Sequence, residues 1–133
     1  MSASQDLQRI IYERLIALQA VHDLVGDRIY DNRPAEANFP CITFGPSDVV
    51  EDDDECITGR IETIQLDCWS RDNARIAPVK RICDVVKAAL HLYHAEPGGS
   101  ALVELRVTGM RYFLDADGLT AHGVVTVQAI MEE

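Results

Sequence analysis

A regular alternation of apolar and polar residues near the end of the chain constrains its fold most strongly. Residues 103–108 and 124–129 each place an apolar side chain at every second position, which is typical of a β-strand with one buried face. The sequence Asp-Ala-Asp-Gly at 115–118 lies between the two runs and favours a tight turn. The chain is therefore predicted to close with an antiparallel β-hairpin.

Two other segments repeat apolar residues every three or four positions, as amphipathic helices do. The first covers residues 4–26, with Ser4 as the predicted N-cap and Gly26 just after the helix end. One side of this helix is apolar and the other is polar, which indicates a helix that lies on a sheet.

The second helical segment covers residues 70–94. Ser70 or Asp72 is its predicted N-cap, and a helix that starts at Asp72 would be kinked in its first turns by Pro78. The Pro-Gly-Gly sequence at 97–99 is predicted to end the helix and turn the chain.

Strand patterns occupy the region between the two helices. Residues 29–30 and 41–45 are predicted strands. Pro46 is expected to disturb the second of them, which continues at 47–50 after a bulge. A longer strand follows at 57–70.

This longer strand either is apolar on both faces or contains a bulge in its middle. Ile64, Leu66 and Cys68 share one face, whereas Ile61 and Trp69 fall on the other. A neighbouring subunit would cover a second apolar face. Ile61 and Trp69 are therefore candidate residues of a subunit interface.

The order of these elements predicts one α+β domain over residues 1–133. Its sheet is mostly antiparallel, with two α-helices packed on one face and a long β-hairpin loop. The other face stays open unless another chain covers it.

The net charge of −10 argues against a protein that grips nucleic-acid phosphates. Apolar runs are too short to span a bilayer, and the first residues do not resemble a signal peptide, so we expect a cytoplasmic protein without a membrane partner. No CxxC pair is present, and the cysteines are expected to be small core residues, except for an exposed Cys56.

No catalytic motif stands out, and we expect no enzyme activity, no metal and no cofactor. His91 and His94 lie three residues apart, as two metal ligands could, but the sequence offers no further ligands. We therefore interpret them as ordinary residues at the end of a helix. The turn at 115–118 resembles the start of a calcium loop, yet the twelfth position is Thr126 rather than Glu. His22 is expected at a helix end and His122 in a strand near the hairpin tip.

Five consecutive carboxylates stand between the two central strands: Glu51, Asp52, Asp53, Asp54 and Glu55. Like charges in a row cannot be buried unpaired, which predicts a solvated, mobile loop rather than a packed strand.

The chain also resembles the tail-terminator, or tail-completion, proteins of long-tailed phages and prophages. The resemblance runs from Leu7 to Met131 and is carried by "LVGDRIYDNRP", "FPCITFG", "IQLDCWSRDNA", "PVKRICDVVKAAL" and "RYFLDADGLTAHGVVTVQAIME". No single motif is diagnostic, but their order and spacing together are fairly specific. Cys41 stands where such proteins often carry an aromatic or aliphatic residue.

The resemblance implies a structural protein that forms a ring, usually of six subunits, on the completed tail tube. Such a ring ends tube growth, meets the connector or head-completion protein, and lets DNA pass without specific binding. It implies assembly in the bacterial cytoplasm and then a place in the virion tail. In that setting Glu51 to Glu55 are expected to face the tube or the lumen.

Two alternatives remain open. One is another head–tail joining protein of similar fold, a neck component. The other is a small metal- or ligand-binding α+β domain that would use His91, His94 and the acidic run.

Overall fold

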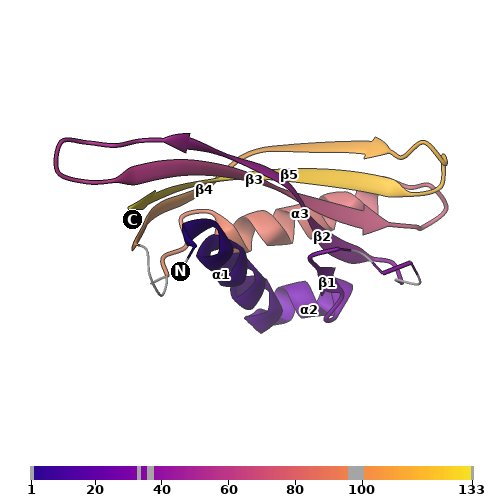
Figure 1. Cartoon of the computed structure of the whole chain (residues 1–133). Coiled ribbons are helices and arrows are strands. Elements are labelled where there is room, and N and C mark those ends of the chain that lie inside the picture. Colours follow the sequence, from indigo (N-terminus) through magenta and orange to yellow (C-terminus); the bar gives the residue numbers. More distant parts are fainter. Residues whose placement is uncertain (1, 33, 36–37, 96–100, 133) are drawn as a thin grey trace.

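A computed structural model describes residues 2–32, 34–35, 38–95 and 101–132. Its helices are α1 (Ala3–Ala17), α2 (Gln19–Val25) and α3 (Ala77–Leu90), and its strands are β1 (Ile29–Tyr30), β2 (Cys41–Glu51), β3 (Gly59–Ser70), β4 (Ala101–Leu114) and β5 (Ala121–Glu132). The strands form one sheet in the order β1-β2-β3-β5-β4, with the helices gathered on one face (Figure 1). Pairing is antiparallel except between β1 and β2, so the predicted α+β class is confirmed.

The first predicted helix is two helices. The backbone of Leu18 is extended, with φ −93° and ψ 127°, and separates α1 from α2. Ser4 is not the N-cap, because Ser2 takes that position and its side chain accepts a hydrogen bond from the Gln5 amide. The Ser4 hydroxyl instead donates to Glu62 of β3 at 2.7 Å. Gly26 follows α2 as predicted, at φ +62°.

The second predicted helix starts later than either proposed cap. Ser70 ends β3 and Asp72 lies in the following loop, where it pairs with Arg75 at 2.8 Å. Ile76 is the N-cap of α3 and provides no side-chain hydrogen bond. Pro78 lies in the first turn, where an amide has no helical acceptor in any case, so it starts the helix instead of kinking it. The predicted turn at 97–99 lies outside the described residues.

Irregular pairing is confined to the outer long strands of the described sheet. The β2–β3 register shifts between Phe44 and Ser47, where a bulge at Pro46 was predicted. The β3–β5 register is continuous from Gly59 to Ser70. The β4–β5 register shifts twice, first between Leu102 and Glu104 and then between Val107 and Gly109.

One of these shifts corrects the predicted face of Val103. The alternation placed Val103 with Leu105 and Val107 on the buried side, but Val103 is 46% exposed whereas Leu105 is fully buried. The extra residue of the bulge has no partner on β5, so the alternation restarts after it.

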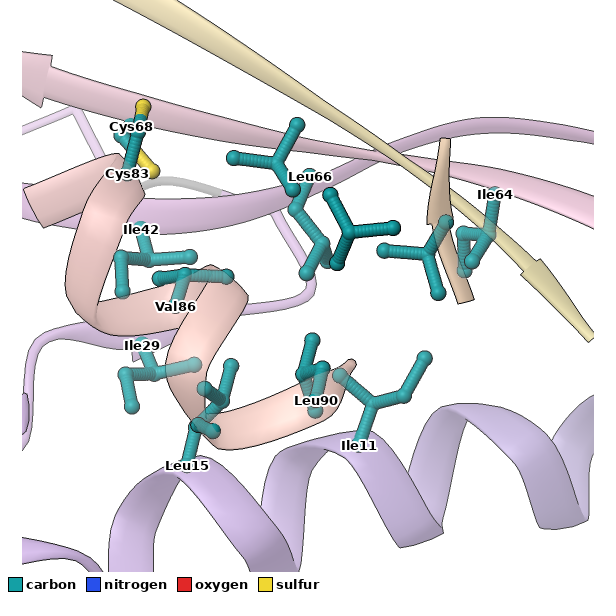
Figure 2. Packing of buried hydrophobic residues seen from close by; sticks show 14 of the residues in the cluster. Ile11, Leu15, Ile29, Ile42, Ile64, Leu66, Cys68, Cys83, Val86 and Leu90 are labelled. Carbon is teal, nitrogen blue, oxygen red and sulfur yellow. The ribbon is translucent and has the colours of Figure 1, made fainter. Parts of the chain in front are cut away.

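The core lies between the sheet and the helices (Figure 2). Ile64, Leu66 and Cys68 of β3 face it as predicted. Gly123 of β5 lets α3 approach closely, since a β-carbon there would lie 2.5 Å from the Cys83 Sγ atom. Further cysteines are buried and Cys56 is exposed, as predicted. In the described part of the chain, no helix is long and apolar enough to cross a membrane.

Candidate functional site

The acidic run forms the tip of the β2–β3 hairpin, which extends beyond the helices at one end of the sheet (Figure 1). Glu51 is the last residue of β2, and residues 52–58 connect it to β3. All the carboxylates of this run are exposed. The predicted connection between two long strands is therefore confirmed, although its mobility stays a prediction.

The tip is a closed turn that its own residues hold together. The Asp52 amide donates to the Gly59 carbonyl at 2.9 Å, and the Asp54 amide donates to the Ile57 carbonyl at 2.8 Å. The Asp53 carboxylate accepts from the Gly59 amide at 3.0 Å. These bonds present the carboxylates to solvent on a defined loop, which creates a strongly negative potential at this end of the molecule.

The face of the sheet opposite the helices carries a cluster around Trp69. The Trp69 indole stacks on the His122 ring, with centroids 3.9 Å apart and an interplanar angle of 15°. The Trp69 Nε1 group donates to the Thr43 hydroxyl at 3.0 Å, and His122 Nε2 lies 2.7 Å from an Asp67 carboxylate oxygen. We call Thr43, Asp67, Trp69, Phe113 and His122 the Trp69 cluster.

Four neighbouring strands, β2, β3, β5 and β4, build this cluster. Register pairing places His122 beside Trp69 on one side and Phe113 on the other, and Phe113 tilts against the His122 ring at 4.7 Å. The Arg111 guanidinium lies 5.2 Å from the centre of the Phe113 ring. A rigid aromatic surface held by hydrogen bonds is the kind of surface that anchors protein contacts.

Ile61 lies on the same open face but far from Trp69. The two residues are eight positions apart on β3, which corresponds to about 26 Å along a strand. Ile61 lies in register between Val50 of β2 and Ile130 of β5, so these side chains form an apolar row next to the acidic tip. The two predicted interface residues therefore mark separate regions of one face.

His91 and His94 lie at and just after the end of α3. His91 is the C-cap residue, and its Nδ1 atom accepts a hydrogen bond from the Val107 amide at 3.0 Å. His94 follows after the helix end. Within the described residues, no group of three or more histidine, cysteine, aspartate or glutamate side chains is placed to hold a metal ion.

The 115–118 segment is the β4–β5 turn that the sequence predicts, with Gly118 at φ +68°. Asp117 accepts hydrogen bonds from the Thr120 hydroxyl at 2.7 Å and from the Leu119 and Thr120 amides. The Thr120 hydroxyl and then these amides lower the pKa of the Asp117 carboxyl to about 2. The carboxylate therefore ties the turn together.

The sequence indicated Trp69 as a candidate interface residue, which stays a prediction, and did not indicate the residues around it. Asp67, Phe113 and His122 come from positions up to 55 residues apart, and their proximity depends on the exact register of β3, β5 and β4. The alternation did contain one indication of His122. Extending the alternation of residues 124–129 back to position 122 places His122 on the face opposite the buried residues, which is the face assigned to Trp69.

Comparison with known proteins identifies the family. The family model described as "Tail completion protein gp17" matches residues 9–132. No curated protein sequence matches the chain. A chain in the solved structure titled "Virion of native gene transfer agent (GTA) particle" has the same fold, with a TM-score of 0.92 at 21% identity over 99% of this chain and 98% of that one. Because the family model covers nearly the whole sequence, the chain belongs to the phage tail-completion protein family.

Proposed function

We propose that the protein forms a ring on the end of a completed phage tail tube, ends tube growth and provides the surface that receives the head. Its partners are further copies of itself, six in the assembled tail, the tail tube protein, and a connector or head-completion protein. DNA passes through the ring without specific binding. Assembly takes place in the bacterial cytoplasm and leaves the protein in the virion tail.

Besides family membership, the main support for this proposal is that the two faces of the sheet differ. The helices bury one face, whereas the other carries the Trp69 cluster and the row around Ile61. A ring requires two different surfaces on each subunit that fit one another, since a contact between identical surfaces gives only a closed pair. The open face is well suited to be one of these surfaces.

The acidic tip fits a place near the tube or the DNA path. Exposed carboxylates repel phosphates, so a lumen lined by Glu51 to Glu55 would let DNA slide without being held. The same charge would also discourage a further tube ring from stacking if the tip faces outward, because like charges across an interface are costly.

The direct test mixes the purified protein with tail tubes that lack it and examines the tube ends by electron microscopy. We expect a ring at one end of each tube and no further growth when tube protein is added. Binding to isolated heads without binding to tubes would support a neck protein instead. Tubes that continue to grow in a large excess of the protein would refute the proposal.

Trp69 provides a sharper version of this test. Trp69→Ala should raise the protein concentration needed for capping about 30-fold or more, because an aromatic anchor contributes about 2 kcal/mol or more to an interface. Tyr12→Ala is the matched control, since Tyr12 is an aromatic residue, 40% exposed, on the helical side of the sheet. Urea unfolding of both variants separates a lost contact from a lost fold. Capping by the Trp69 variant at the wild-type concentration would exclude Trp69 from the interface.

A further inference from the structure

A groove lies at the end of the sheet opposite the acidic tip. It encloses about 280 Å³, between the end of β3, the start of α3 and α2. Its lining residues are Leu24, Pro40, Ser70, Arg71, Asp72, Pro78, Arg81 and Ile82. We call it the Arg71–Arg81 groove. It combines half-buried and buried apolar side chains with two exposed arginines.

Arg81 is available to a partner carboxylate, and Arg71 remains half exposed beside the ion pair that it makes with Asp117. Arg81 is exposed and makes no ion pair with the described residues. Arg71 is positioned by the Thr120 hydroxyl at 2.8 Å and by the Phe39 ring, and lies 3.5 Å from Asp117, yet its side chain is 52% exposed. Asp72, the carboxylate of the groove, is already paired with Arg75.

The tip of the β2–β3 hairpin has the complementary chemistry. Ile57 is 43% exposed and follows the five carboxylates Glu51 to Glu55. An exposed apolar side chain next to carboxylates matches an apolar groove next to arginines. Burying Ile57 there would bring the neighbouring carboxylates to cationic side chains that bind them well.

The tip of one chain cannot reach its own groove. The twelve residues of β3 run from the tip to the groove, which corresponds to about 40 Å. Figure 1 shows the hairpin and the β3–α3 connection at opposite ends of the sheet. The occupant therefore has to come from a second molecule.

We infer that the end of the acidic tip next to Ile57 docks into the Arg71–Arg81 groove of the next copy, which leaves the carboxylates at the Glu51 end to face the tube or the lumen. The two surfaces differ, so the contact can be repeated from copy to copy, and it closes a ring when the rotation between neighbours divides a full turn. This inference rests on the proposed ring and names the contact that closes it.

Cys56 makes the contact directly testable, because it lies at the tip and is exposed whereas Cys41, Cys68 and Cys83 are buried. In the variant Asp72→Cys, which changes a lining residue of the groove and keeps both of its arginines, mild oxidation of rings on tube ends should link Cys56 of one copy to the introduced thiol of the next. Disulfides form only when the two α-carbons come within about 7 Å. We expect a ladder of covalent multimers on non-reducing gels.

Two controls define the outcome. Lys87→Cys introduces an exposed thiol in the last turn of α3, away from the groove, and should give at least tenfold less multimer. Adding Cys56→Ser to Asp72→Cys should abolish the ladder. If rings cap the tubes but Asp72→Cys gives no more multimer than Lys87→Cys, the docking inference is wrong and the proposed function stands. If the wild-type protein does not cap tubes at all, both are wrong.

Charge reversal gives an independent measurement. Arg81→Glu should raise the concentration needed for ring formation at least tenfold, and adding Glu55→Lys should recover most of that loss by restoring opposite charges across the contact. Lys87→Glu is the matched control and should have little effect. Unchanged ring formation by Arg81→Glu would overturn the inference, provided that urea unfolding shows an intact fold.

Discussion

The close approach of α3 to the sheet depends on Gly123, and replacing this glycine tests that packing directly. A β-carbon at Gly123 would lie 2.5 Å from the Cys83 Sγ atom and 3.1 Å from a Val79 methyl group. Cys83 is itself fully buried, so α3 has to move or the side chain has to leave its rotamer. Overpacking of this kind costs about 1–3 kcal/mol. With a urea dependence of about 2 kcal/mol per molar, Gly123→Ala should lower the unfolding midpoint by about 0.5–1.5 M.

The same substitution on a neighbouring strand provides a matched control. A β-carbon at Gly109 of β4 meets no atom within 4 Å, and the backbone there does not have a positive φ. Gly109→Ala should therefore leave stability unchanged or raise it by up to about 1 kcal/mol through the unfolded chain. Both variants are measured by equilibrium urea unfolding followed by circular dichroism.

A double-mutant cycle identifies the colliding atom. Cys83→Ala removes the Sγ atom and should cost about 1 kcal/mol by itself, since it deletes one buried group. In that background Gly123→Ala should cost at least about 1 kcal/mol less than in the wild type, which is a coupling energy expected of residues in contact. Gly123→Ala behaving like Gly109→Ala, or costs that simply add, would refute the proposed collision.

Three further outcomes are expected. A thiol reagent should modify Cys56 rapidly in the folded protein and spare Cys68. Cys68 is buried, and its hydrogen bond with Cys83 and its burial both raise the pKa of its thiol. Rapid reaction of more than one thiol would contradict this prediction. The hydrogen bonds that lower the pKa of Asp117 to about 2 stabilise the β4–β5 turn at pH values above the ordinary carboxyl pKa of 3.8. This stabilisation is lost as the pH falls through about 2. An NMR titration of the Asp117 carboxyl with a midpoint near 4 would show that these hydrogen bonds are absent in solution. Replacing Glu51 to Glu55 with Ser and Asn should change the urea midpoint little, because exposed like charges add no stability and Asp53→Asn keeps an acceptor for the Gly59 amide. A large fall in the midpoint would show that the carboxylates contribute to folding.

Much of the architecture could be predicted because periodicity reflects burial. The long strands have one buried face, and the helical segments have one apolar side, so both classes of element are visible in the order of apolar residues. The bulge at Pro46 was also predictable, since proline lacks an amide for the ladder.

The errors have local physical reasons. Apolar residues continue across Leu18, so nothing in their spacing reveals that its backbone is extended. Ser70 and Asp72 have good capping side chains, but the helix begins where Pro78 fits its first turn. Val103 follows the alternation and still faces solvent, since the bulge shifts the pairing by one residue.

The candidate interface was only partly predictable. Trp69 and Ile61 could be assigned to the second face from one strand alone, whereas the Trp69 cluster requires the register of several strands. The Arg71–Arg81 groove could not be predicted from the sequence, because Leu24, Pro40 and Arg81 lie far apart in the chain and come together only in the folded protein.

The position of the register shifts has a consequence for the free subunit. A sheet edge with regular, unpaired amides and carbonyls invites strands of other molecules to add, which leads to aggregates. The pairing of the outer strand β4 is interrupted twice. On the other side, β1 covers β2 only at Ile42 and Thr43. The pairing of β2 shifts near Pro46, and the strand ends at Glu51, the first residue of the acidic run. Neither edge offers a long regular template, while the central strands remain continuous. We therefore expect these interruptions to hinder the addition of strands from other molecules and to keep the free subunit from aggregating.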